Sequence, residues 1–144
     1  MYTDGSCNPA KKLGAWAAII LMFGEEIVLS GTKMTSSHNA MELLAAIKAL
    51  EYVEKMSPLQ ELVLYSDSQY VVGAVTRMDA LIASDFITGK GTERKNRELL
   101  ETFFLLIQKL SPRLSKVAAH QKKTAKRNIN REVDKLARKL VRKS

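Results

Sequence analysis

Cysteine is almost absent from this chain of 144 residues, which contains a single one, Cys7. One cysteine excludes an intramolecular disulfide and a zinc site built from cysteines, and it fits a reducing compartment. Long apolar runs are also absent, which excludes a helix that spans a membrane. Residues 1–5 do not resemble the start of a signal peptide, in which a positively charged segment is followed by an apolar one. We therefore expect a cytoplasmic protein with no membrane partner.

Apolar residues are not scarce enough in this chain, and charged residues are not abundant enough, to predict disorder. Apolar residues make up 46% of the chain and charged residues 26%, which is ordinary for a globular protein. At this length one core can bury roughly two-thirds of the surface of the unfolded chain. We expect a single domain over residues 1–144, with a basic loop and a C-terminal helix at 121–144.

The first 121 residues lack any excess of charge, because they hold 13 basic and 13 acidic groups. The net charge of +8 therefore belongs to residues 122–144, which contain ten basic and two acidic residues. Such a cluster attracts polyanions and suggests a phosphate backbone as partner. A solvated basic tail that aids solubility explains the charge alone equally well.

The hydrophobic pattern predicts strands and helices in alternation after an opening hairpin. Strands are expected before and around Asp4 and over 13–23, 27–33, 61–65 and 114–119, with a turn at Glu25-Glu26. Helices are expected over 39–56, 69–76, about 79–86, 93–110 and 129–143. Ser37, His38 or Asn39 would cap the first helix. This order predicts an α/β fold, a mixed sheet with helices on both faces.

Four carboxylates stand where a structural role is hard to assign. Asp4 and Asp67 are expected at strand ends, Glu42 in the first turn of a helix, and Asp134 in the last helix. Ligands of open α/β sheets collect at strand ends, so neighbouring strands would bring the two aspartates together. Each acid also has a separate structural explanation, as a turn residue, a helix-dipole partner or an ion pair with Arg138.

Clustered carboxylates repel one another unless a cation lies between them. Mg²⁺ prefers such oxygen ligands together with water and phosphate. Two ions about 3.5–4 Å apart can activate a water and stabilise the leaving oxygen of a phosphodiester. Together with the basic C-terminal segment, the four acids favour a metal-dependent nuclease.

The segments around these acids resemble those of a type 1 ribonuclease H, over almost the whole chain. The resemblance lies in residues 2–9 (YTDGSCNP), 39–47 (NAMELLAAI), 65–71 (YSDSQYV) and 130–137 (NREVDKLA). It implies an RNase H-like fold, a five-stranded mixed sheet whose first three strands are antiparallel and the rest parallel. The implied activity is hydrolysis of the RNA strand of RNA–DNA hybrids by in-line attack of water, which leaves 5′-phosphate and 3′-hydroxyl ends.

By the same resemblance, the four acids are catalytic metal ligands for two Mg²⁺ ions, or for Mn²⁺ in their place. His120 matches a catalytic histidine that transfers protons or helps product leave, a task that suits a group titrating near neutrality. Positions that match substrate contacts, or lie in the basic loop beside them, are Asn8, Ser37, Asn39, Gln69, Lys122 and Lys123. Of these, Ser37 matches a hydroxyl near a phosphate of the DNA strand. We expect His38 to be a cap or a surface residue. It stands where the family usually has a substrate-contacting asparagine, so contact with RNA is the alternative.

The chain departs from the family in two places. Many members carry a basic, Trp-rich protrusion, whereas residues 78–92 here contain no tryptophan, so we expect weak contact with the hybrid there. The loop before Asp134 is longer and more basic than usual. We expect a monomer, the alternative being a dimer through residues 78–88. Two other functions stay open: a module that binds hybrid or double-stranded RNA without cutting, and a resolvase-type nuclease on the same fold.

Overall fold

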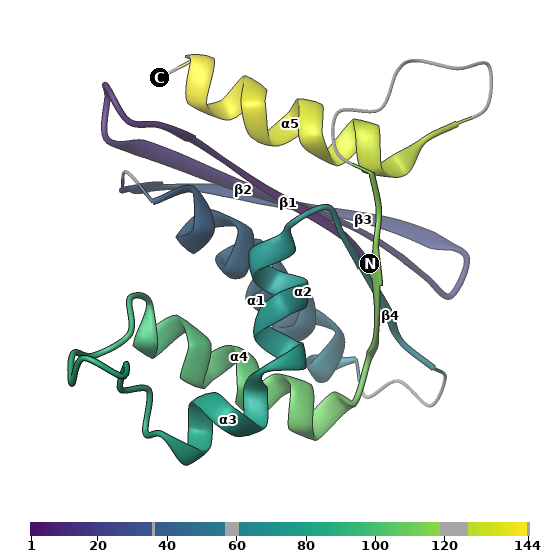
Figure 1. Cartoon of the computed structure of the whole chain (residues 1–144). Coiled ribbons are helices and arrows are strands. Elements are labelled where there is room, and N and C mark those ends of the chain that lie inside the picture. The colour runs from purple at the N-terminus through teal and green to yellow at the C-terminus, as the bar shows by residue number, and fades with distance from the viewer. Residues whose placement is uncertain (36, 57–60, 119–126, 144) are drawn as a thin grey trace.

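The computed structural model describes residues 1–35, 37–56, 61–118 and 127–143. Its elements follow the predicted order (Figure 1). They are β1 (Tyr2–Asn8), β2 (Leu13–Met22), β3 (Glu25–Met34), α1 (His38–Lys55), β4 (Val63–Ser66), α2 (Gln69–Thr76), α3 (Met78–Ala83), α4 (Arg97–Leu110), β5 (Arg113–Lys116) and α5 (Ile129–Lys143).

The five strands form one mixed sheet in the order β3-β2-β1-β4-β5. β1 pairs antiparallel with β2 and β2 with β3, whereas β1 and β4, and then β4 and β5, are parallel. This is the arrangement that the resemblance implied. β1 lies in the middle of the sheet: β2 pairs with it from Tyr2 to Asn8, whereas β4 pairs only with Tyr2 and Thr3.

Helices cover both faces of the sheet, as Figure 1 shows with α5 on one side and α1 on the other. Alternate residues of β2 explain the two layers. Ala18 and Ile20 belong to the large core that contains the buried face of α1, while Ala17 and Ile19 pack with Val133 of α5. The prediction of helices on both faces is therefore confirmed. In the described part of the chain, no helix is long and apolar enough to cross a membrane.

Several element boundaries differ from the sequence prediction. β5 ends at Lys116, before the predicted end at residue 119, and α3 ends at Ala83, before the predicted end near residue 86. Two further differences follow from backbone with positive φ. The hairpin turns at Phe23 and Gly24, with φ of 53° and 73°, so β3 begins at Glu25 and the turn predicted at Glu25-Glu26 was wrong. Two consecutive positive φ values suit the twist of a tight hairpin. The helix expected from residue 93 begins at Arg97, because Asn96 before it has a φ of 63°.

Residues 78–92 form α3 and a loop closed by a bridge between Ile87 and Glu93. Leu81 and Phe86 belong to the core, at 5% and 7% exposure. Only part of the apolar surface considered for a dimer is therefore available, chiefly Ile82. The monomer expectation stays a prediction.

Candidate active site

A close approach between β1 and α1 builds the first part of the site. A Cβ placed on Gly5 would meet the backbone nitrogen of Glu42 and the backbone carbon of Met41, and would lie 2.8 Å from the Met41 carbonyl oxygen. The helix can therefore reach the strand only where the strand has no side chain. Ser37 is the N-cap that fixes the start of α1, since its hydroxyl accepts a hydrogen bond from Ala40 N at 3.1 Å.

This approach aligns two buried carboxylates. Asp4 and Glu42 are only 2% and 4% exposed. The backbone N–H of Gly5 donates to both, at 2.9 Å to Asp4 Oδ1 and 3.2 Å to Glu42 Oε2. Asp4 lies in the middle of β1 and not at the strand end, so that part of the sequence expectation was wrong.

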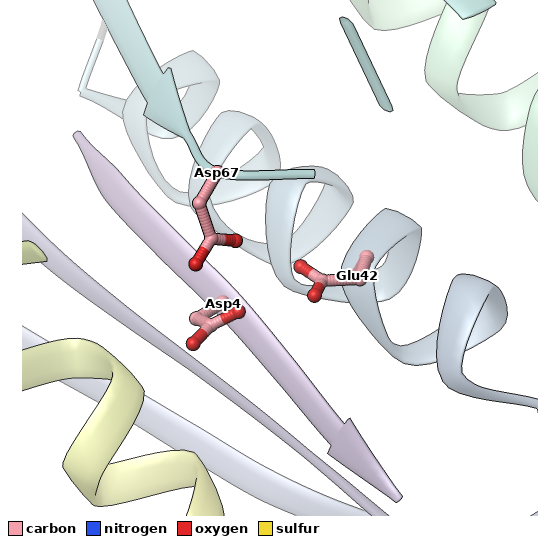
Figure 2. Close-up of side chains that lie close together, drawn as sticks. All are labelled: Asp4, Glu42 and Asp67. Atoms are coloured by element: carbon pink, nitrogen blue, oxygen red, sulfur yellow. The ribbon is translucent and has the colours of Figure 1, made fainter. Parts of the chain in front are cut away.

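Asp67 completes the group; it is the residue that follows β4, and β4 is the parallel neighbour of β1. Carboxylate oxygens of Asp4, Glu42 and Asp67 lie within 4.8 Å of one another. Figure 2 shows the three side chains pointing toward a common space between β1, α1 and the end of β4. We call these three residues the acidic cluster.

Asp134 reaches the same place from α5, across the sheet from α1. It shares a side-chain hydrogen bond with Asp4 and is 14% exposed. Arg138, one helical turn later, holds its Nε 3.7 Å from Asp134 Oδ1. All four acids that the sequence singled out thus come together, from β1, α1, the end of β4 and α5.

The cluster is electrostatically unfavourable while no cation is bound. Burial, first, and then the negative charge of Glu42 and the hydrogen bond with Asp134 raise the pKa of Asp4 to about 11. Burial also raises the pKa of Glu42. At neutral pH the metal-free cluster therefore holds at least one proton that an ordinary surface carboxylate would have lost.

His38 contributes to the site through a contact that was not predicted. It is a surface residue, as expected, with a side chain 60% exposed, and Ser37 is the cap. Its Nε2 also lies 3.0 Å from Glu42 Oε1. This hydrogen bond is the main cause that raises the pKa of His38. The spacing of four residues on one helix face was the signal that could have found the pair.

A cleft of about 510 Å³ opens over the cluster. Of the residues expected to touch substrate, Asn39 and Gln69 line it, together with Arg138 and the four acids. Asn8, at the end of β1, is not among the residues that line it. His120, Lys122 and Lys123 lie outside the described residues.

A second hollow of about 880 Å³ adjoins this cleft, and Asn39 and Tyr70 line both. Ser37 lines the second hollow beside three cations, Arg77, Arg94 and Lys95. The Nε of Arg94 is buried and has no hydrogen-bond partner. No sequence motif separates these cations from ordinary surface residues, so they were not predicted as site residues.

Comparison with known proteins agrees with this geometry. The model of the RNase H family matches residues 1–142. Ribonuclease H of Xanthomonas campestris pv. campestris (strain 8004) is 37% identical over 139 residues, which cover 96% of this chain and 88% of the relative. Ribonuclease HI of Xylella fastidiosa (strain 9a5c) is 35% identical over 138 residues, 95% of this chain and 87% of the relative.

A solved structure supports the fold. The crystal structure of LC9-RNase H1, a type 1 RNase H with the type 2 active-site motif, has a TM-score of 0.75 to this chain at 19% identity. The match covers 96% of this chain and 69% of that one. At this identity the likeness concerns the arrangement of helices and strands.

Proposed function

The chain belongs to the ribonuclease H family, and we propose that it hydrolyses the RNA strand of RNA–DNA hybrids with the acidic cluster and Asp134 as its metal ligands. The observation that carries this proposal is the approach of three carboxylates, the buried Asp4 and Glu42 and the partly buried Asp67, to within 4.8 Å in a chain of this family. A retired site has no evident reason to keep such mutually repelling groups together.

The donor set fits a hard divalent cation. It consists of carboxylate oxygens, which Mg²⁺ prefers. Burial is the largest cause of the raised pKa of Asp4, and the second is the negative charge of Glu42, which a cation would offset. We propose two Mg²⁺ ions, or Mn²⁺ in their place, held by Asp4, Glu42, Asp67 and Asp134. When bound, such ions lower the pKa of water and stabilise charge on a phosphodiester.

The protein's own groups set the positions of these ligands. The Gly5 N–H donates to both Asp4 and Glu42, and His38 bonds the other oxygen of Glu42. The carboxylates are therefore oriented before any substrate arrives, which reduces the reorganisation that the reaction requires. Hydrolysis at this site breaks the P–O3′ bond and leaves a 5′-phosphate and a 3′-hydroxyl.

Asn39 and Gln69 line the cleft and supply amide groups that both donate and accept hydrogen bonds. We assign them to the minor groove of the hybrid, together with Asn8. The 2′-hydroxyl, which DNA lacks, is the group that such contacts can recognise. Ser37 and the cations of the second hollow suit a phosphate of the DNA strand. We keep for His120 the role implied by the resemblance, proton transfer or help in product release, and for Lys122 and Lys123 the substrate binding expected from the charge of the basic loop.

The test is incubation with labelled RNA–DNA hybrid, RNA duplex and DNA duplex, with and without Mg²⁺. We expect cleavage of the hybrid alone, in its RNA strand, and only with the ion. The Asp67→Asn variant, purified identically, controls for contaminating nucleases and should cleave nothing. Binding of hybrid without cleavage in Mg²⁺ or Mn²⁺ would instead indicate a binding module, and cleavage of DNA duplex a resolvase-type nuclease.

Removing the hydrogen bond between His38 and Glu42 should weaken metal binding. We expect His38→Ala to raise the Mg²⁺ concentration for half-maximal cleavage by about 10- to 100-fold, the usual cost of losing a group that orients a metal ligand. His38→Gln keeps an amide donor and should recover most of the loss. Titration of Mg²⁺ against initial rate measures both variants. Equal Mg²⁺ dependence of His38→Ala and wild type would show that Glu42 needs no such support.

A further inference from the structure

The exposed side of α5 carries a line of cations that the proposed chemistry does not use. We propose that this line binds the sugar–phosphate backbone of the hybrid beyond the nucleotide that is cleaved; the inference rests on the proposed function. The residues are Arg131, Lys135, Arg138 and Arg142, and we call them the α5 stripe.

Helical spacing places the four side chains on one line. They follow one another at intervals of four, three and four residues, so they fall within about 60° around the helix axis. At 1.5 Å per residue the line is about 17 Å long. One strand of a duplex presents about five phosphates over that length, at about 3.4 Å of rise each.

The stripe is turned toward the catalytic cleft. Val133, Ala137 and Val141 form the buried face of α5, which packs against β1 and β2. Around the helix, Asp134 lies between this buried face and the stripe. Glu132 lies on the opposite flank, where it pairs with Arg127.

Arg138 joins the stripe to the cleft. It lines the cleft beside the acidic cluster, with its Nε 3.7 Å from Asp134 Oδ1. A phosphate backbone that passes over the acids therefore meets the middle of the stripe as soon as it leaves them. Arg138 thus belongs both to the lining of the cleft and to the stripe.

The positive charge of the α5 stripe indicates that its ligand is a polyanion. Lys135 and Arg142 are exposed, and neither forms an ion pair with another residue in the described ranges. They lie in residues 122–144, which carry the whole net charge of +8. A polyanion that must approach four carboxylates needs attraction nearby, and cations aligned at phosphate-like intervals supply it.

The test compares two double variants that remove the same charge. Lys135→Gln/Arg142→Gln neutralises two exposed members of the stripe and leaves Arg138 on Asp134. Lys48→Gln/Lys55→Gln neutralises two exposed lysines of α1. Direct binding of a labelled hybrid is measured in chelator across a series of salt concentrations, and KM and kcat are measured with Mg²⁺.

The stripe variant should lower the slope of log affinity against log salt by about 1.8, since each phosphate contact contributes about 0.9. At 0.15 M salt this corresponds to about 10- to 30-fold weaker binding, and the effect on cleavage should fall on KM. The α1 variant should retain the slope of the wild type. The proposal is overturned if the wild type and both variants show the same slope of log affinity against log salt. It is also overturned if the stripe variant loses binding to anionic vesicles while its slope for the hybrid equals that of the wild type.

The outcome for the stripe is separate from the outcome for the activity. Cleavage by the wild type with equal slopes rejects the stripe and leaves the proposed function intact. If the wild type cleaves no hybrid in any divalent ion, the proposed function fails, and the slopes measured in chelator still decide whether the stripe binds hybrid.

Discussion

Asp4→Asn is expected to lower hybrid cleavage by at least about 10³-fold and, at the same time, to stabilise the metal-free protein. Loss of a central ligand removes several kcal/mol of charge stabilisation from the reaction. The same change relieves the cost of a carboxylate that is 2% exposed and faces Glu42. We expect a gain of about 1–3 kcal/mol in the free energy of unfolding, or at least a few degrees in Tm.

The pH dependence of this gain has a definite sign. The pKa of Asp4 is about 11 in the folded chain, against an ordinary value of 3.8. The stability that its protonated form contributes is therefore complete below about pH 4 and is lost as the pH rises toward 11. Metal-free wild type should lose stability relative to Asp4→Asn across this window, as thermal unfolding at a series of pH values would measure.

Added Mg²⁺ should reverse the order of the two proteins. An ion that binds only the folded state raises Tm in proportion to the logarithm of its concentration over Kd. We expect this rise for the wild type and little for Asp4→Asn. An Asp4→Asn variant that is less stable than wild type without metal, or equally stabilised by Mg²⁺, would contradict the assignment of Asp4.

Gly5→Ala should damage both stability and activity, although it adds a single methyl group. The new Cβ would meet backbone atoms of Met41 and Glu42, which cannot rotate away. Relief requires α1 to move from β1, at a cost of about 1–3 kcal/mol or more. The same movement separates Glu42 from Asp4, and a displacement of about 1 Å in a catalytic group can lower the rate about 10²-fold.

Gly73→Ala is the matched control for this substitution. Gly73 lies within α2, and the nearest atom to an added Cβ is Gln69 Nε2 at 3.8 Å. Alanine should fit there and stabilise the helix by up to about 1 kcal/mol. Chemical denaturation and hybrid cleavage compare the two variants. Equal stability and activity of Gly5→Ala and wild type would show that α1 can shift without loss.

The fold was largely predictable because its hydrophobic patterns are strong. Residues 13–22 are almost entirely apolar and form the long strand β2, and the five helices were expected near their observed positions. Two of the errors lie where the backbone adopts a conformation that the pattern of side chains does not indicate. Phe23 and Asn96 adopt positive φ without being glycine, so the hairpin turn and the start of α4 were misplaced by a few residues.

The four acids of the site could be predicted from the sequence, but the contacts that hold them in position could not. Four carboxylates in recognisable segments indicated where charge would collect, and the structure brings them together. The close approach at Gly5 and the contact of His38 with Glu42 depend on how α1 meets β1. Such contacts between distant segments have no local signature, although the spacing of His38 and Glu42 along the helix was visible.

The origin of the four acids in β1, α1, the end of β4 and α5 has a consequence for biosynthesis. Asp4 precedes almost all of these residues and Asp134 follows almost all of them. A chain that stops before residue 134 therefore lacks one of the four acids, and α5 must dock on the sheet to bring Asp134 to the others. Hybrid cleavage should consequently be absent from any chain whose synthesis stops before α5.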